Sequence, residues 1–325
     1  MYPQDELAIF CRKGLGALFK ELQLVDSFVE IDKNLGGWKK AEDQLKKQNY
    51  NLIVSVHQSF RTAKIVSSLN AKNKIGYYKW WNFWSYNKRV LRPMHLPEAL
   101  RQLYLISSLD SELYKSLESL QVEKNFLNEQ TQLNLHSSLS IPQWASCSIR
   151  SELSLHKLNL TDFMLPERYI VVSPGSIWPT KRWTESGFIE LVESLPLPCV
   201  LLGSSDEKEI CERIHKSTSN SINLCGKTNL LESLLILSKA SLAVSNDSGA
   251  QHMAAAVDCP VVSVFGPTVL EFGYRPWTSK ARVAEVDLKC RPCGKHGAKE
   301  CPLGTHDCMK KLRSEQVLKL AKELL

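Results

Sequence analysis

The feature that most constrains this chain is the alternation of short apolar runs with segments of helical periodicity. Six runs in the second half have the composition of buried strands, and helix-like segments separate most of them. Such alternation predicts a parallel sheet whose strands are joined by crossover helices. Ligands bind these sheets at the carboxyl ends of the strands, so the loops after the strands should carry the function. The six runs are Tyr169–Ser173, Pro198–Gly203, Ile222–Leu224, Ser241–Ser245, Pro260–Gly266 and Ala281–Glu285.

The first half shows the same alternation less regularly. Glu6–Cys11, Ser27–Ile31 and Asn51–His57 are typical of strands, and Lys39–Gln48 and Ser59–Leu69 are typical of helices. A chain of 325 residues is long enough for two domains. We predict an α/β protein divided into a domain at residues 1–150, a linker at 151–167, a second domain at 168–310 and a C-terminal helix at 311–325.

Composition excludes several classes of protein. The chain is 43% hydrophobic and 23% charged, which is typical of an ordered globular protein and not of a disordered one. No apolar run approaches the roughly 18 residues that cross a bilayer, and the start lacks the regions of a signal peptide. We therefore expect a cytoplasmic protein.

The positive charge is concentrated in one stretch. The formal net charge is +7, yet no Asp or Glu occurs between Gln44 and Pro97, where ten Lys and Arg are present. One interpretation is a solvated basic face. The other is a patch for an anionic partner, such as a phosphorylated substrate, a membrane surface or nucleic acid.

The segment Ser173–Trp183 has the composition of a phosphate-binding loop between a strand and a helix. Gly175 lets the backbone approach a ligand, Ser176 offers a hydroxyl group, and Lys181 and Arg182 offer positive charge. The spacing is not that of a P-loop. Taken alone, a segment of this kind is more often an ordinary turn than a binding loop.

A second segment, Ser245–His252, ends a predicted strand and begins a helix. Free N–H groups at Ser248 and Gly249 and the helix dipole favour an anion, and His252 lies one turn further along. The plainer interpretation makes Asp247 a helix cap and His252 a buried histidine.

Five segments follow one another along the chain: Pro-Gly-x-x-Trp-Pro-x-Lys-Arg-Trp, Leu-Gly-Ser-x-x-Glu, Asn-Leu-Cys-Gly-Lys-Thr, Asn-Asp-Ser-Gly-x-x-His and Phe-Gly-Pro-Thr. In this order and spacing they resemble the heptosyltransferases of glycosyltransferase family 9. The resemblance is specific over about residues 168–310, and it continues more weakly upstream, where Asn51–Arg61 and Lys74–Tyr77 look like an acceptor-domain strand, helix and following loop. It implies a GT-B fold, in which two Rossmann-like doubly wound domains face each other across a cleft.

The resemblance also implies an activity and its partners. The reaction would be an inverting transfer of heptose from ADP-heptose, bound by the C-terminal domain, to the lipopolysaccharide inner core, bound by the N-terminal domain. No cofactor is expected for catalysis, and nucleic acid is not expected as a partner. The protein would be cytoplasmic, in peripheral contact with the inner membrane of a Gram-negative bacterium.

The family pattern assigns donor contacts residue by residue. Ser176 and Lys181 would meet the diphosphate, and either Asp206 or Glu207 would take a ribose or heptose hydroxyl. The other expected donor residues lie on the adenine side (Lys227 and Thr228, beside Gly226) and at the diphosphate and sugar (Asp247, Ser248, Gly249 and His252).

The acceptor side is expected in the first half of the chain. By the same resemblance Arg61 would meet an acceptor phosphate or carboxylate, with His57 and Gln58 beside it. The acid-free stretch agrees with an anionic glycolipid. The aromatic run Tyr77–Trp84 would either rest among lipid headgroups or line the wall of a cleft.

The N-terminal domain departs from the family pattern. Family members open with a strand and a loop that ends in Gly-Asp, whose Asp is the general base, whereas Met1 leads here into what matches the second strand. We expect that the first strand and helix stand upstream of Met1; the alternative is a degenerate, non-catalytic protein that binds nucleotide sugars. If the chain is active as given, His57 or His95 is the first candidate base.

Four cysteines are grouped near the C-terminus. A Cys-x2-Cys pair with two further cysteines has the ligand count of a structural zinc site, although the second pair lacks the same spacing. Free thiols are the next interpretation and a disulfide the last. The four are Cys290, Cys293, Cys301 and Cys308.

Overall fold

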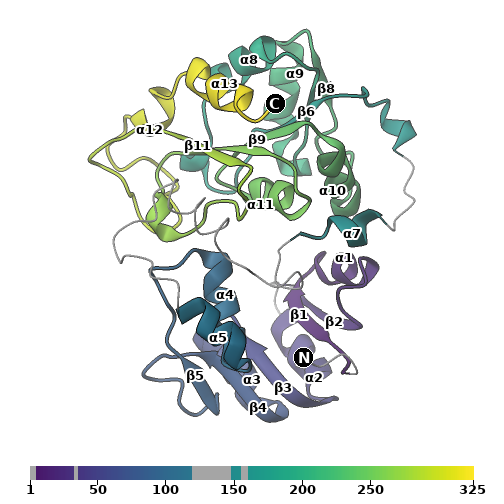
Figure 1. The fold of residues 1–325 in the computed structure, drawn as a ribbon, viewed down its shortest axis with the longest axis vertical. Helices are drawn as coiled ribbons and strands as arrows, with labels where there is room; N and C mark the ends of the chain where they lie inside the picture. Colours follow the sequence, from purple (N-terminus) through teal and green to yellow (C-terminus); the bar gives the residue numbers. More distant parts are fainter. Residues whose placement is uncertain (1–4, 33–35, 119–147, 155–159) are drawn as a thin grey trace. The chain divides into compact units, whose positions relative to one another are not determined.

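The computed structural model describes the chain except for residues 1–4, 33–35, 119–147 and 155–159 (Figure 1). The chain forms two compact units, Met1–Val122 (unit 1) and Glu123–Leu325 (unit 2). Part of the linker expected at 151–167 lies outside the described residues. No described helix is both long and apolar enough to cross a membrane.

Unit 2 contains a six-stranded parallel sheet in the order β11-β10-β9-β6-β7-β8. The chain runs outward from β6 to β8 and then returns to β9 on the other side of β6. This is the strand order of a Rossmann fold, and all six predicted strands are confirmed. The strands are β6 (Ile170–Ser173), β7 (Cys199–Leu201), β8 (Ser221–Asn223), β9 (Leu242–Asn246), β10 (Val261–Phe265) and β11 (Ala281–Glu285).

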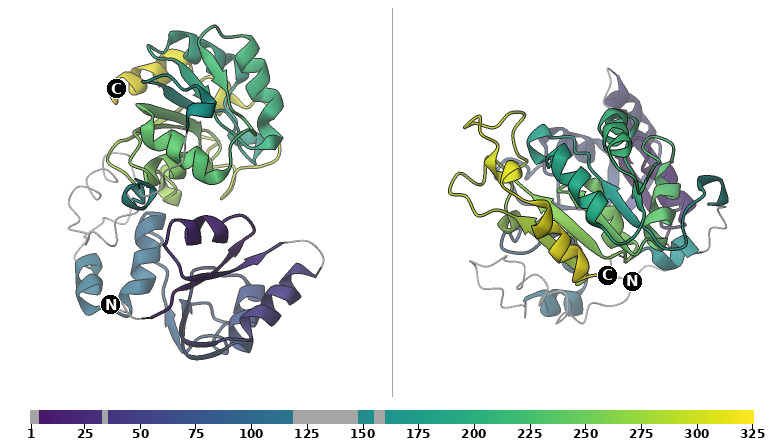
Figure 2. Two further views of the ribbon diagram at one scale, coloured as in Figure 1. Left: turned by 90° about the vertical axis from the view of Figure 1, so that its right-hand side faces the viewer. Right: turned by 90° about the horizontal axis from the view of Figure 1, so that it is seen from above.

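Helices cover both faces of this sheet. Figures 1 and 2 show α8, α9 and the C-terminal helix α13 on one face and α10 and α11 on the other. Local sequence starts two of them, because Thr184 caps α8 and Asn229 forms a capping box with Glu232 in α10. The described α-helices of unit 2 are α7 (Arg150–Ser154), α8 (Glu185–Ser194), α9 (Lys208–Lys216), α10 (Leu230–Lys239), α11 (Gly249–Ala256), α12 (Asp307–Lys310) and α13 (Ser314–Lys322).

Unit 1 holds two smaller parallel sheets, β1-β2 and β3-β4-β5. The strands are β1 (Ala8–Arg12), β2 (Ser27–Ile31), β3 (Asn49–Ser55), β4 (Asn70–Tyr77) and β5 (Lys88–Val90). The helices are α1 (Gly16–Glu21), α2 (Gly37–Leu45), α3 (Phe60–Ser68), α4 (Glu98–Ser107) and α5 (Ser111–Glu118).

One expectation for unit 1 was wrong. Lys74–Tyr77, expected to be a loop, forms the end of the central strand β4. Its polar composition disfavours a strand, but the neighbours β3 and β5 pair with it on both sides. The side chains of Ile75 and Tyr77 pack against Leu105 of α4. Burial therefore decided the structure where local propensity did not.

We predict that Trp183→Ala destabilises the protein by about 3–5 kcal/mol, the usual cost of truncating a buried Trp. Trp183 is 1% exposed, packs edge-on against Phe188 and donates its indole N–H to the Leu312 carbonyl at 3.0 Å. The matched control is Trp80→Ala, because Trp80 is 80% exposed. Urea unfolding of the control should change by less than about 0.5 kcal/mol; equal losses for both variants would contradict this packing.

Candidate functional site

The candidate site lies where the strand order of unit 2 reverses, between β6 and β9. These strands pair in parallel with Ser173 opposite Ser245, so both predicted loops leave the same edge of the sheet. The loops are joined by a buried ion pair, in which the Lys181 Nζ lies 2.5 Å from the Asp247 Oδ2. The structure thus brings together two predicted residues that are 66 positions apart.

The Asp247 carboxylate is held by three donors. Besides Lys181, the Thr268 hydroxyl donates to Oδ2 at 2.6 Å and the Gln251 amide donates to Oδ1 at 3.0 Å. Thr268 follows β10, and Gln251 lies in the first turn of α11, so the carboxylate connects three loops and a helix. A buried carboxylate needs such partners, because its desolvation is otherwise costly.

Asn246 fixes the loop after β6 from the neighbouring strand. Its side-chain amide donates to the Pro174 carbonyl at 2.7 Å and accepts from the Trp183 N–H at 3.0 Å. Asn246 is fully buried, so the loop between these two contacts has a defined course.

The N-terminus of α11 is open to solvent. The Ser248 side chain caps the helix by accepting from the Ala250 N–H, and Gly249 is exposed in the first turn. A Cβ atom at Gly249 would meet nothing within 4 Å. The first-turn N–H groups and the helix dipole therefore adjoin free space of the kind that anions occupy.

His252 lies in the same helix, and its side chain is solvent-accessible although many protein atoms surround it. The Gln251 Nε2 lies 3.4 Å from the His252 Nε2. Desolvation and the Lys181 cation lower the pKa of His252, while the Asp247 carboxylate opposes them. The exposed side chain does not fit the buried histidine of the plainer interpretation, and Ser248, not Asp247, caps the helix.

The Glu207 side chain closely approaches the backbone at Gly175, the residue before Ser176. Ser176 is buried, and its carbonyl accepts from the Arg182 Nε at 2.8 Å. A Cβ atom at Gly175 would lie 1.7 Å from the Glu207 Oε1, so only glycine leaves room for this carboxylate. Glu207 also closes a capping box with Ser204, whereas Asp206 is exposed.

Lys227 and Thr228 follow β8, and β7 separates that strand from β6. The Lys227 Nζ donates to the Asn223 carbonyl at 2.8 Å, and the Thr228 hydroxyl lies 2.8 Å from the Ser233 hydroxyl. Both residues lie at the carboxyl edge of the sheet, further along it than the Lys181–Asp247 pair.

Of the three predicted acceptor residues, Arg61 lies in the first turn of α3 in unit 1, and His57 and Gln58 lie in the loop just before it. The His57 Nδ1 is 2.8 Å from the Thr62 hydroxyl. The backbone N–H of Thr62 donates to the Ser59 hydroxyl, which caps the helix. The Arg61 guanidinium lies 4.9 Å from the centre of the Trp38 ring, in a cation–π contact. Gln58 is half-buried beside them.

The cysteine segment packs against the candidate site. The Cys293 N–H donates to the Pro267 carbonyl at 2.9 Å, and the His306 Nε2 lies 2.8 Å from the Thr180 carbonyl. Backbone N–H groups, first that of His306, lower the pKa of Cys301. None of the four cysteines is in a disulfide bond in the structure. Within the described residues, no three His, Cys, Asp or Glu side chains are placed to hold a metal ion, so structural zinc stays a prediction.

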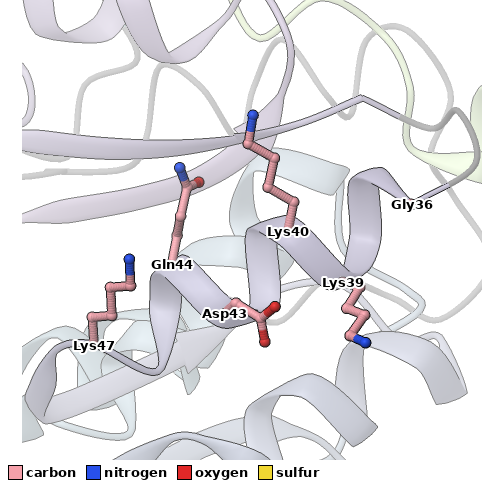
Figure 3. Close-up of a pocket in the computed structure, with 6 residues that line it drawn as sticks. All are labelled: Gly36, Lys39, Lys40, Asp43, Gln44 and Lys47. Carbon is pink, nitrogen blue, oxygen red and sulfur yellow. The ribbon is translucent and has the colours of Figure 1, made fainter.

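A depression of about 430 Å³ lies elsewhere, on α2 of unit 1 (Figure 3). Figure 3 shows the side chains of Lys40, Gln44 and Lys47 on one side of the helix. None of the residues predicted to bind donor or acceptor lines it. The lining residues are Gly36, Lys39, Lys40, Asp43, Gln44 and Lys47.

Sequence reasoning missed three residues of the site as functional residues: Asn246, Gln251 and Thr268. Gln251 follows Asp247 by four positions, so helical spacing alone would have placed the two side chains on one face. Asn246 ends β9 and Thr268 lies in the loop after β10, but their partners are distant in the sequence, and no local pattern records such contacts.

The comparisons with known proteins agree on one family. A sequence profile described as glycosyltransferase family 9 (heptosyltransferase) matches residues 38–303. Lipooligosaccharide heptosyltransferase 2 of Campylobacter jejuni is 33% identical over 168 residues, which are 49% of this chain and 51% of that protein. Lipopolysaccharide heptosyltransferase 3 of Escherichia coli K12 is 25% identical over 246 residues, 72% of this chain and 63% of that protein.

Among solved structures, the ADP-heptose lipopolysaccharide heptosyltransferase II of E. coli superposes with a TM-score of 0.70 at 21% identity, over 99% of this chain and 90% of that one. This likeness and the two parallel-sheet units define a protein of the GT-B fold. The chain belongs to glycosyltransferase family 9, the heptosyltransferase family. It spans about half the length of the first curated relatives that it matches.

Breaking the buried pair should destabilise the protein. Lys181→Ala leaves the Asp247 carboxylate buried without its cation, and we expect a loss of about 3–5 kcal/mol in urea unfolding. Thr268→Val removes one hydrogen bond to the same carboxylate and should cost about 1.5–3 kcal/mol. The control Lys216→Ala removes an exposed pair with Glu212 and should cost less than about 1 kcal/mol. A Lys181 variant as stable as the control would contradict the described network.

The zinc prediction is checked by metal analysis of the protein purified without chelator. It requires about one zinc per chain, lost in Cys290→Ser and Cys301→Ser, because a structural site uses all four thiolates. Cys259→Ser, in a buried cysteine outside the segment, is the control. A zinc content far below one equivalent per chain would contradict the prediction.

Proposed function

We propose that this chain transfers heptose from ADP-heptose to the inner core of lipopolysaccharide, with inversion at the anomeric carbon. In this reaction an acceptor hydroxyl oxygen bonds to the anomeric carbon. The bond from that carbon to the phosphate oxygen breaks, its electron pair leaves with ADP, and the hydroxyl proton passes to a base. Family membership and the names of the relatives, which are heptosyltransferases, support the proposal.

The observation that carries the proposal is the open N-terminus of α11 directly after a neutralised carboxylate. ADP-heptose brings a negatively charged diphosphate, which first-turn N–H groups are suited to bind. An unpaired Asp247 would repel it. The contact with Lys181 at 2.5 Å cancels that charge. An ammonium group has three N–H donors, so the same lysine can also donate to a phosphate oxygen.

The remaining donor residues are proposed around this anchor. Ser248, Gly249 and His252 would hold the diphosphate and sugar. Ser176, with Glu207 or Asp206, would meet donor hydroxyls and phosphate at the loops after β6 and β7. Lys227 and Thr228, further along the sheet edge, would lie on the adenine side.

The acceptor is proposed to bind unit 1 at the start of α3. The stretch between Gln44 and Pro97 contains ten cations and no carboxylate, which suits a phosphorylated glycolipid. A protein acting on such an acceptor would work at the cytoplasmic face of the inner membrane, in peripheral contact with it.

Gly249→Ala should weaken ADP binding without weakening the fold. The added methyl group meets no protein atom, and alanine is the better helix former, so thermal stability should stay or rise. The methyl group would, however, occupy the space proposed for the diphosphate. Calorimetry on the full chain should show at least about a tenfold rise in the ADP Kd, equivalent to about 1.4 kcal/mol. An unchanged Kd would exclude the diphosphate from this helix end, and ADP binding without heptose transfer would favour a binding-only protein.

Acceptor binding should depend on salt and on Arg61. Exposed charges are screened beyond about 8 Å at physiological ionic strength, so acceptor affinity should fall with salt more steeply than ADP affinity. Arg61→Ala should raise the acceptor KM and leave the ADP Kd unchanged. Replacing Lys88 and Arg89 should cause a smaller loss that disappears at high salt. Acceptor titrations at two ionic strengths check this, and a silent Arg61→Ala would show that the acceptor binds elsewhere.

A further inference from the structure

The loop after β4 presents large aromatic side chains to water. Trp80 is 80% exposed and Phe83 is 66% exposed, and Tyr78 and Trp84 are also exposed. Single apolar residues on a surface are ordinary, but four aromatic side chains within seven residues form a patch that marks an interaction site.

This exposure belongs to a well-defined loop. Asn82 is buried at the loop's centre, where its side-chain amide donates to the Tyr77 carbonyl at 2.9 Å and accepts from the Lys79 N–H at 3.0 Å. At the far end, the Tyr86 hydroxyl donates to the Ser55 hydroxyl at 3.0 Å. The aromatic side chains are therefore displayed by a folded scaffold.

The patch continues onto α3. Phe60, exposed in the first turn of that helix, packs with ring centres 5.5 Å from Trp81 and 5.7 Å from Trp84. We call the exposed members, Phe60, Tyr78, Trp80, Phe83 and Trp84, the aromatic surface.

Cations accompany the aromatic surface. Lys79 lies within the loop, and Lys88 and Arg89 follow it on β5, all with exposed side chains. The Arg89 guanidinium lies 5.1 Å from the centre of the Tyr78 ring. Glu98 is the first acidic residue after the acid-free stretch between Gln44 and Pro97. Its Oε2 lies 2.5 Å from the Arg92 Nη2, so its charge is already compensated.

We infer that the aromatic surface docks unit 1 onto an anionic lipid bilayer. Amphipathic Trp and Tyr rings favour the headgroup region, and basic side chains are attracted to anionic lipids. Protein interfaces also use aromatic rings, but here the rings lie within the acid-free stretch, whose cations suit the phosphates of lipid headgroups. The inference rests on the proposed function, since a membrane-bound acceptor gives such a surface its use.

The test is sedimentation of the full chain with vesicles that contain no lipopolysaccharide. Phosphatidylcholine vesicles with a quarter of phosphatidylglycerol should bind the protein, and pure phosphatidylcholine should bind it much more weakly. The double variant Trp80→Ser, Phe83→Ser should lower the bound-to-free ratio on the mixed vesicles at least about tenfold, because both rings would lose their burial in the interface.

The matched control is Met164→Ser, Leu303→Ser in unit 2, since these side chains are 84% and 63% exposed. It should bind within about twofold of the parent, a change no larger than an ordinary surface substitution produces. Equal losses in both double variants, or no binding of the parent to mixed vesicles, would overturn the inference. Binding only after a phosphorylated glycolipid acceptor is added would overturn it in favour of an acceptor contact. ADP calorimetry on the same samples tests the proposed function separately.

Discussion

The contact between Lys181 and Asp247 organises the candidate site. It joins the loop after β6 to the end of β9, where the strand order reverses. Burying two opposite charges is not stabilising by itself, because desolvation offsets most of their attraction. The arrangement holds because Thr268 and Gln251 also donate hydrogen bonds to the carboxylate. The Lys181–Asp247 pair is therefore electrically neutral, and it lies next to the N-terminus of α11, which is open to an anion.

The surrounding structure supports this cluster from two sides. Asn246 fixes the backbone of the loop that carries Lys181, and Trp183 anchors the end of that loop to the segment before α13. The cysteine segment contacts Thr180 and Pro267, the neighbours of Lys181 and Thr268. Substitutions in the cysteine segment should therefore alter the geometry of the site through the loops after β6 and β10, which the segment contacts.

The sequence predicted the sheet of unit 2 well because a strand buried on both faces must be continuously apolar. The loops of the site were predicted for the same reason, since they follow those strands. The Lys181–Asp247 contact was not predicted, because a tertiary pair leaves no periodic signal. Strand β4 was missed because its Asn and Lys residues are polar, and only pairing with two neighbours makes it a strand. The close approach of the Glu207 side chain to Gly175 could not be predicted either, although the motifs contain both residues.

The most direct measurement is a crystal structure of the full chain with ADP. We predict that the diphosphate oxygens accept from first-turn N–H groups of α11, the Gly249 N–H among them, with Lys181 within hydrogen-bond distance. The Asp247 carboxylate should still be held by Thr268 and Gln251. ADP bound away from β6 and β9, for example at the basic depression on α2 with its phosphates on Lys39 and Lys40, would contradict the account.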